Sequence, residues 1–247
     1  MPRAARKKSS SGIYHVMLRG INQQQIFQDE EDNKKFLQVI EECKKISGFE
    51  LYSYCLMGNH VHLLLKEREE PLELIFKRIG SRYVYWYNIK YKRIGHLFQD
   101  RYKSCVVESD EYFLSALRYI HNNPVKAGIA KSSKEYKFSS YNSYFEKASL
   151  VDTKAVLDMI SINQFEKFHT EKDSIKHIEI EEPRIRITDE EAKRIIKEYT
   201  GCGSVEEYQA LPMEKQKEHV QNYKFEKMSI RQICRLTGMS KSIVQEL

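Results

Sequence analysis

Residues 49–66 read FELYSYCLMGNHVHLLLK and hold two runs of strand-forming residues around a single turn. The pair Gly58-Asn59 separates the two runs, and such a pair between hydrophobic segments is typical of a β-hairpin. Side chains at positions i and i+2 of a strand point to the same face. His60 and His62 therefore lie side by side, whereas the aliphatic residues around them face the other way. The stretch predicts a hairpin that carries two imidazoles on one face.

The chain on either side of this hairpin predicts the rest of one domain. Hydrophobic periodicity and capping residues give a strand over residues 13–18, a helix opened by Asp29 and Asp32 and stopped by Gly48, the hairpin, a helix from Pro71 toward Asn88, a strand over residues 96–107, and a helix over residues 111–122 that Asp110 caps and Pro124 ends. The order β-α-β-β-α-β-α predicts an α+β fold, a ferredoxin-like sandwich with helices on one face of an antiparallel sheet.

Composition and periodicity divide the chain into three parts. Residues 1–150 form the α+β domain, and residues 151–182 are mixed in charge and short of apolar periodicity, as in a linker. Residues 183–247 predict a small all-α domain of short helices. Within it, residues 229–244 resemble a helix-turn-helix, with a glycine-containing turn between two helices. We expect this domain to bind DNA, and the alternative is a helical module that only packs.

Basic residues concentrate between Lys77 and Lys103. The whole chain has 41 Lys and Arg against 35 Asp and Glu, but this stretch has eight basic residues and a single acid, Asp100. Cations interleaved with aromatic rings suit the phosphates and unstacked bases of a single-stranded nucleic acid. The alternative is a solvated helix whose rings belong to the core. The rings are those of Tyr83, Tyr85, Trp86, Tyr87, Tyr91, Phe98 and Tyr102.

Cysteine usage and the start of the chain favour a cytoplasmic protein. The five cysteines are odd in number and contain no C-x-x-C pair, which predicts reduced thiols rather than a disulfide framework or a zinc ribbon. The N-terminus is basic and Ser-rich but lacks the apolar segment of a signal peptide. No apolar run reaches the roughly 18 residues of a membrane-spanning helix. We therefore expect no membrane partner.

A second pattern, RYIHNNP at residues 118–124, stands at the end of a predicted helix. Tyr119 and Asn123 are four residues apart and share a helical face if the helix extends that far. A hydroxyl nucleophile and a neutral oxygen ligand would then face one site. Pro124 disfavours the α conformation at Asn123. The alternatives are a core role for Tyr119 and a structural role for the two strand histidines.

Taken together, five ordered motifs resemble those of the single-tyrosine HUH transposases, and among these the branch of REP-associated tyrosine transposases. The resemblance covers roughly residues 13–145 and includes residues 138–141, where Phe138 replaces a common Trp. The five motifs are residues 14–20, 26–27, 55–62, 95–103 and 118–125.

The resemblance implies a metal-dependent endonuclease and strand transferase acting on single-stranded DNA folded into imperfect hairpins. It implies that His60 and His62 bind Mg²⁺ or Mn²⁺ and that Asn123 stands at the position of the third ligand. Several members of the family carry Gln there, and Asn is shorter. Tyr119 would be the nucleophile. The rival tyrosines outside this motif are Tyr83, Tyr102 and Tyr112.

The chemistry that follows is a reversible strand transfer. A tyrosine hydroxyl, with an ordinary pKa of about 10, is a poor nucleophile at neutral pH. A divalent metal would polarise a nonbridging oxygen and orient the phosphate, so that Tyr119 becomes joined to the 5′-phosphate and frees a 3′-hydroxyl. Two alternatives stay open: a replication-initiator or relaxase nuclease, and a domesticated regulator that binds DNA without cutting it.

The residues expected to contact DNA come from both domains. Some relatives assemble their site between two subunits, whereas REP-associated relatives are more often monomers, and we favour a monomer here. The candidate DNA-binding residues are Arg19, Lys77, Arg82, Arg93, Arg101 and Lys103 in the first domain and Arg231 and Lys241 in the second.

Overall fold

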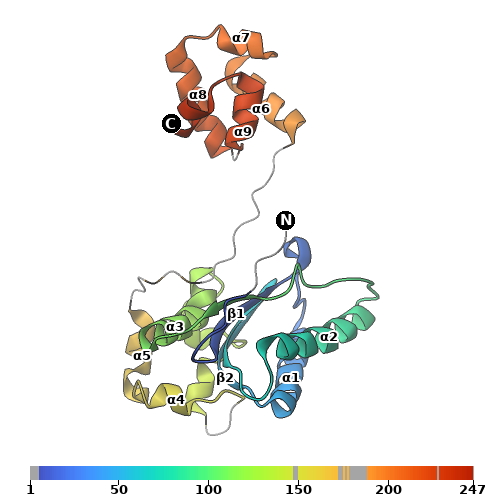
Figure 1. Cartoon of the computed structure of the whole chain (residues 1–247), viewed down its shortest axis with the longest axis vertical. Coiled ribbons are helices and arrows are strands. Elements are labelled where there is room, and N and C mark those ends of the chain that lie inside the picture. The colour runs from blue at the N-terminus through green and yellow to red at the C-terminus, as the bar shows by residue number, and fades with distance from the viewer. Residues whose placement is uncertain are drawn as a thin grey trace. The chain divides into compact units, whose positions relative to one another are not determined.

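The computed structural model describes residues 6–146, 150–171, 175, 177, 188–226 and 228–246. The chain divides into two compact units, residues 1–178 and 179–247 (Figure 1). The first unit is built on a four-stranded antiparallel sheet in the order β2-β3-β1-β4. This is the arrangement of a ferredoxin-like sandwich and confirms the predicted α+β fold. The strands are β1 (Ile13–Arg19), β2 (Glu50–Met57), β3 (His60–Lys66) and β4 (Lys103–Val106).

Two helices, α1 (Glu30–Ser47) and α2 (Leu72–Lys90), cover one face of this sheet (Figure 1). The N-cap of α1 is Asp29, whose carboxylate accepts a hydrogen bond from the backbone N–H of Asp32 while the Asp32 side chain reaches back, so that both form a capping box. The helix ends at Gly48, which adopts the left-handed conformation with φ of 64°. Both boundaries were predicted from the sequence.

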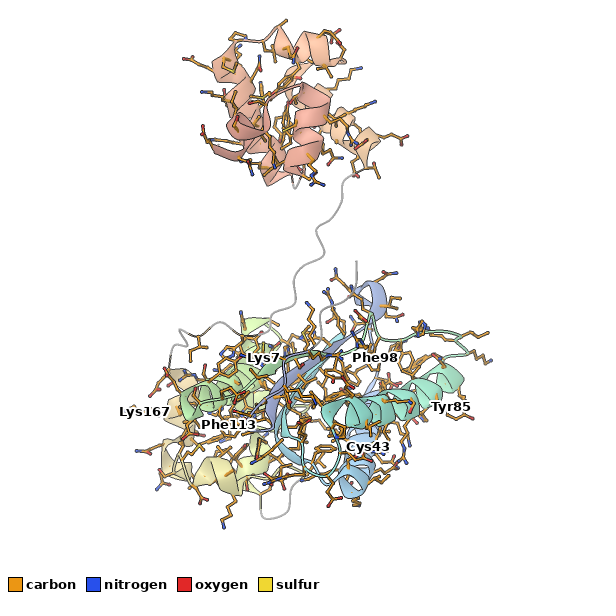
Figure 2. The ribbon with its side chains drawn as sticks, viewed as in Figure 1. Lys7, Cys43, Tyr85, Phe98, Phe113 and Lys167 are labelled. Carbon is orange, nitrogen blue, oxygen red and sulfur yellow. The ribbon has the colours of Figure 1, made fainter. Side chains whose placement is uncertain are left out.

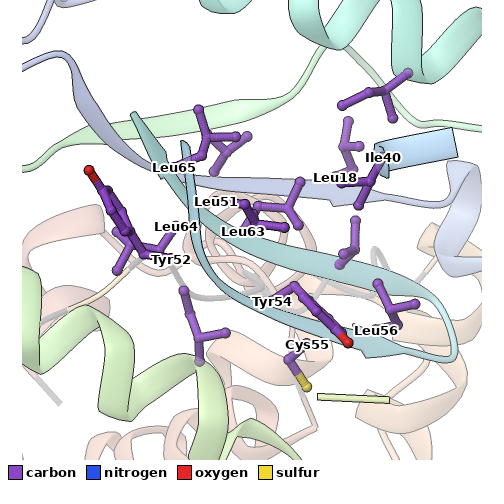
Figure 3. Close-up of a cluster of buried hydrophobic side chains, with 14 of the residues drawn as sticks. Leu18, Ile40, Leu51, Tyr52, Tyr54, Cys55, Leu56, Leu63, Leu64 and Leu65 are labelled. Carbon is purple, nitrogen blue, oxygen red and sulfur yellow. The ribbon is translucent and has the colours of Figure 1, made fainter. Parts of the chain in front are cut away.

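The main hydrophobic core lies between α1, α2 and the sheet. Ile40 of α1 and the hairpin residues Leu63 and Leu65 are fully buried there (Figure 3). The rings of Phe36 and Tyr83 meet edge to face with centroids 4.9 Å apart. Burying one such side chain contributes about 1.5–3 kcal/mol. Because a shift of one residue would turn these side chains out of the core, their burial fixes which face the two histidines occupy.

The opposite face is covered by α3 (Asp110–Lys126) (Figure 1). Its N-cap is the extended residue Ser109, which accepts from the N–H of Tyr112, so Asp110 is not the predicted cap but the first helical residue. Pro124 lies inside the helix and does not end it as predicted. A proline near the C-terminus removes a single backbone hydrogen bond, and the Ala127 N–H still donates to the Asn123 carbonyl at 3.0 Å.

The strand predicted over residues 96–107 is shortened to β4. Residues 96–102 make only an isolated bridge, between Phe98 and Gly20. The physical reason is that their partner strand ends at Arg19, after which the chain turns into the short 3₁₀ helix η1 (Ile21–Gln23). The backbone of this segment still bonds to the end of β1, where the Gln99 N–H donates to the Arg19 carbonyl at 2.9 Å.

Part of the segment predicted as a linker folds onto the first unit instead. Val156 of α4 (Lys154–Leu157) and Phe165 of α5 (Ile162–Thr170) are fully buried in the same core as the sheet. The Phe165 ring stacks on Tyr144 at 4.6 Å. The compact unit therefore extends to residue 178, past the predicted boundary at 150. Two short 3₁₀ helices precede α4, η2 (Ser133–Glu135) and η3 (Asn142–Phe145).

The second unit is a bundle of short helices around its own core, as predicted. Tyr208, Tyr223, Ile233 and Val244 are fully buried in it. Its last two helices are joined by a turn at Gly238, which is left-handed with φ of 72°. Among the described residues of both units, no helix is long and apolar enough to cross a bilayer. The helices are α6 (Asp189–Thr200), α7 (Val205–Gln209), α8 (Met213–Phe225), α9 (Ile230–Thr237) and α10 (Lys241–Glu246).

Candidate active site

The two strand histidines lie on the face of the sheet that α3 covers. His60 and His62 are 6% and 0% exposed, and their ring centroids are 5.2 Å apart with the planes at 90°. The register of β1 and β3 sets Arg19 opposite His60 and Met17 opposite His62. The structure therefore brings the two imidazoles together as the spacing predicted.

His15 on β1 is a further histidine of this site, which the sequence analysis did not single out. Its Nε2 lies 3.0 Å from His62 Nδ1, and both side chains are fully buried. Burial lowers the pKa of His15 to about 3 and holds the pKa of His62 well below its usual 6.5, so both rings are neutral. In the tautomer in which the His62 Nδ1–H donates a hydrogen bond to His15 Nε2, the Nε2 of His62 carries a lone pair. No described residue bonds to that buried nitrogen.

Asn123 faces the other histidine of the pair. Its Oδ1 is 3.4 Å from His60 Nε2, while His60 Nδ1 lies 2.7 Å from Asn59 Oδ1. Burial lowers the pKa of His60 to about 4. Because the amide oxygen of Asn59 accepts, the single proton of the neutral His60 ring belongs on Nδ1, and Nε2 presents a lone pair toward Asn123.

Tyr119 joins this group from α3, on the same face of the helix as Asn123. Its ring lies 5.6 Å from that of His62 and 5.8 Å from that of His15. The ammonium of Lys126 stands 5.5 Å from the centre of the Tyr119 ring. The tyrosine is half-buried, so its ring is packed but not enclosed. His60 and His62 of the hairpin and His15 of β1 thus lie close to Tyr119 and Asn123 of α3.

His177 is a residue of the site that no sequence signal indicated, because it follows a mixed-charge segment without periodicity. Its ring stacks on Tyr119 with centroids 4.6 Å apart and planes at 29°. Its Nε2 lies 2.8 Å from the hydroxyl oxygen of Ser115, one turn before Tyr119 on α3. The ring of Tyr112, a rival nucleophile, lies 5.5 Å from that of His177.

The donor atoms of the site fit a divalent cation. His62 Nε2 has no partner, and His60 Nε2 and Asn123 Oδ1 face each other as lone-pair donors. Imidazole nitrogens and an amide oxygen are suitable ligands for first-row divalent ions. The described residues contain no cluster of three or more His, Cys, Asp or Glu side chains placed to bind a metal. An ion held here would therefore take its remaining ligands from the substrate or water.

The other rival tyrosines are part of the framework. Tyr83 is fully buried and donates its hydroxyl to the Ile26 carbonyl. Tyr102 is 7% exposed and packs on Phe76 with centroids 4.6 Å apart. Several rings of the basic stretch therefore belong to the core, as the alternative interpretation predicted, whereas Tyr85 is 71% exposed on the outer surface of α2 (Figure 2).

The predicted DNA-binding residues lie at the surface of their units. Lys77, Arg82, Arg101 and Lys103 are exposed, and Arg19 and Arg93 are half-buried. Arg82 forms a salt bridge with Glu42 at 2.9 Å, and the Glu42 carboxylate weakens the attraction of Arg82 for a phosphate. In the second unit, Arg231 and Lys241 are exposed on α9 and α10.

A cavity of about 640 Å³ opens between α2 and the segment that precedes β4. Leu97 and Tyr102 are among the apolar residues that line it, and its charged lining residues include Lys77 and Arg101 as well as Glu73 and Asp100. The Arg6 guanidinium stands 3.9 Å above the Tyr102 ring. Apolar walls with cations around them match the needs of a flat base attached to a phosphate.

Comparison with known proteins gives matches to transposases. Residues 8–123 match the family model described as "Transposase IS200 like". A solved structure of the REP-associated tyrosine transposase bound to a REP hairpin aligns with 60% of this chain and 87% of that chain, at 17% identity and a TM-score of 0.52. A candidate transposase from Deinococcus radiodurans R1 aligns with 49% of this chain and 97% of that chain, at 20% identity and a TM-score of 0.36. No curated protein matches the sequence.

Proposed function

We propose, from the match of residues 8–123 to the IS200-like transposase family model, that the chain cuts and rejoins single-stranded DNA through a bond between Tyr119 and a 5′-phosphate. His60, His62 and Asn123 hold the Mg²⁺ or Mn²⁺ ion that the reaction needs. The enzyme is thus a metal-dependent tyrosine transposase.

The observation that carries this proposal is that Tyr119 lies beside an imidazole, His62, whose buried Nε2 has no partner among the described residues. Tyr119 and Asn123 come from α3, and His60 and His62 come from β3, yet the Tyr119 and His62 rings are 5.6 Å apart. A core tyrosine needs no such neighbours. The buried lone pair of His62 Nε2 would be destabilising by about 1–3 kcal/mol if no ligand engaged it. That arrangement supports a site built for a cation and a nucleophile together.

The reaction conserves the number of phosphodiester bonds. The Tyr119 oxygen forms a bond to phosphorus, the bond from phosphorus to the 3′-oxygen breaks, and the tyrosine proton ends on that 3′-oxygen. A divalent ion supplies charge neutralisation at the nonbridging oxygens. His60 and His62 hold their lone pairs in a fixed direction because Asn59 and His15 bond to their Nδ1 atoms. In the reverse direction, a 3′-hydroxyl of another strand displaces Tyr119.

The substrate that suits this site is a hairpin with a single-stranded extension. The solved structure of similar fold holds a REP hairpin, and we extend that DNA class to this chain. The exposed cations Lys77, Arg101 and Lys103 and the adjoining cavity offer phosphate and base contacts for the extension. The helix pair α9–α10, with Arg231 and Lys241, provides a second DNA contact. We propose that the protein acts as a monomer.

The test is a covalent-adduct assay with a labelled hairpin oligonucleotide. In Mn²⁺, the wild-type protein forms a protein–DNA band that resists denaturation, and Tyr119→Phe forms none while still binding the hairpin. Tyr112→Phe, which alters a tyrosine of the same helix, keeps the band. An adduct formed by Tyr119→Phe would assign the nucleophile to another tyrosine.

The metal ligands are tested in the same assay. His60→Ala and His62→Ala abolish cleavage and lower Mn²⁺ affinity, but leave hairpin binding largely intact because phosphate contacts elsewhere supply most of that affinity. Full cleavage activity in EDTA would contradict the metal site.

A further inference from the structure

The helix that carries Tyr119 is held from its other side by α5. Residues 118, 121 and 122 project from α3 about 120° away from residues 119 and 123, because each helical residue turns by about 100°. All three reach α5. Arg118 donates to the Phe168 carbonyl at 3.3 Å, Asn122 donates its amide N–H to the His169 carbonyl at 2.8 Å, and the His121 and His169 rings stack with centroids 5.0 Å apart.

The contact between the two histidines belongs to a chain of hydrogen bonds whose direction can be assigned. His169 Nδ1 is 2.7 Å from the Phe165 carbonyl, which can only accept, so that nitrogen carries the proton. The Nε2 of the neutral ring then accepts from His121 Nδ1 at 2.8 Å. His121 Nε2 must accept in turn, and the Ser140 hydroxyl donates to it at 2.8 Å. The backbone N–H of Tyr54 donates to the same hydroxyl oxygen at 2.8 Å.

This chain is sealed inside the protein and spans three parts of the fold. His121 and Ser140 are 0% exposed and His169 is 7% exposed. Burial lowers the pKa of His169 to about 4, so its ring is neutral. Every polar atom of the two imidazoles has a partner, which fixes both tautomers. Any rotation or slide of α3 would break at least one of these bonds in a dry environment, where an unmade bond is most destabilising.

We propose that the His121–His169 pair is a clamp by which α5 positions the catalytic helix, so that both histidines are positioning residues for the cleavage reaction. The inference rests on the proposed function. His169 and Ser140 lie beyond residues 8–123, the part matched to the transposase family. The clamp acts on Tyr119 and Asn123 through the rigid helix, because neither histidine reaches the substrate from the far side of α3. A misplacement of reacting groups by about 1 Å can lower a rate about 100-fold.

The first test concerns the clamp itself and needs no DNA. Nitrogen chemical shifts of the full-length protein at neutral pH should show both His121 and His169 as the neutral tautomer with the proton on Nδ1. A proton on Nε2 of either ring, or a charged ring, would overturn the hydrogen-bond chain.

The second test compares single-turnover cleavage by three variants of the full chain. His169→Leu removes both side-chain bonds. Phe165→Leu is the matched control, because the fully buried Phe165 ring packs on both Tyr144 and His169 but makes no hydrogen bond, so its loss weakens packing and leaves the hydrogen-bond chain in place. We expect His169→Leu to lower the cleavage rate constant at least about tenfold with unchanged hairpin affinity. Phe165→Leu, at matched folded fraction, keeps a rate within about twofold of wild type.

The third variant, His169→Gln, restores an acceptor for His121 Nδ1 and should recover most of the rate. Equal rates for His169→Leu and Phe165→Leu, together with a wild-type adduct, would overturn the clamp alone. Absence of an adduct from the wild-type protein would overturn the proposed function. The tautomer measurement would still test the hydrogen-bond chain in that case, because it uses no DNA.

Discussion

The neutral state of His169 makes a quantitative prediction about acid stability. The pKa of this histidine falls from 6.5 to about 4 on folding, mainly through burial. As the pH drops below 6.5, the unfolded chain takes up a proton at this position and the folded protein does not, so the unfolded state gains stability. The contribution of His169 to stability is therefore complete above the unfolded pKa and is lost progressively as the pH falls toward 4.

The magnitude follows from the two pKa values. Between about pH 7.5 and about pH 5.5, the unfolded state gains about 1.4 kcal/mol from protonation at this one position, and the folded state gains almost nothing. His121, whose pKa burial also holds well below 6.5, shifts stability in the same direction. Replacing His169 by Gln should thus reduce the loss of stability over this interval by about 1.4 kcal/mol.

Urea unfolding followed by tryptophan fluorescence measures this quantity for the first unit alone, because Trp86 is the single tryptophan of the chain and lies on α2. Wild type and His169→Gln are compared at both pH values, with Phe165→Leu as a control that is destabilised without losing a titratable group. The reasoning is refuted if wild type and His169→Gln lose the same stability between the two pH values.

Three further predictions test other parts of the structure. Gly80 lies inside α2, and apart from its chain neighbours and the backbone of that helix no atom lies within 4 Å of the position of an added Cβ. Gly80→Ala should therefore raise the stability of the first unit by about 1 kcal/mol in the same urea assay, and a loss of stability would contradict the open space described there. His15→Leu should weaken Mn²⁺ binding about 10- to 100-fold by calorimetry, because it removes the group that orients His62, whereas His15→Gln keeps an acceptor and should bind more tightly than His15→Leu; unchanged affinity for His15→Leu argues against that orienting role. Replacing Arg231 and Lys241 together by Gln should reduce the slope of log affinity against log salt by about 1.8 for a duplex hairpin stem, and identical slopes would favour a second unit that only packs.

The hairpin and its histidines could be predicted from sequence because their information is local. Side-chain alternation in β3 places His60 and His62 on one face whatever their surroundings, and the Asp29 cap and Gly48 stop are set by backbone geometry at each end of α1. The same local reasoning gave a linker where α5 folds. The few apolar residues of α5 do not indicate a packed helix by themselves, because the helix is buried through contacts such as that of the Phe165 ring with Tyr144. Hydrophobic periodicity does not predict a contact between segments.

The residues missed at the site share this dependence on distant partners. His15 and His177 lie 47 and 62 residues from their bonded partners His62 and Ser115. Neither stands in a spacing pattern with another site residue. The sequence analysis wrongly predicted that Pro124 ends the helix. That rule assumes a helix whose other contacts do not compensate for the one backbone hydrogen bond that proline removes. In α3 the last turn is held by packing on both faces, so the loss is tolerated and Asn123 stays helical.

The two faces of α3 have opposite hydrogen-bonding character, and this contrast bears on how the site works. On the α5 side, each imidazole nitrogen of His121 and His169 has a partner, and the structure there is complete without a ligand. On the sheet side, the buried His62 Nε2 lacks a partner among the described residues, and the cation that we propose would complete the bonding there. A helix made rigid on one side can hold Tyr119 and Asn123 in place against the proposed cation site on the other. The hydrogen-bond network of His121 and His169 thus stabilises the helix independently of the His60–His62 side. Ion binding should therefore rigidify the sheet side of α3 far more than its α5 side.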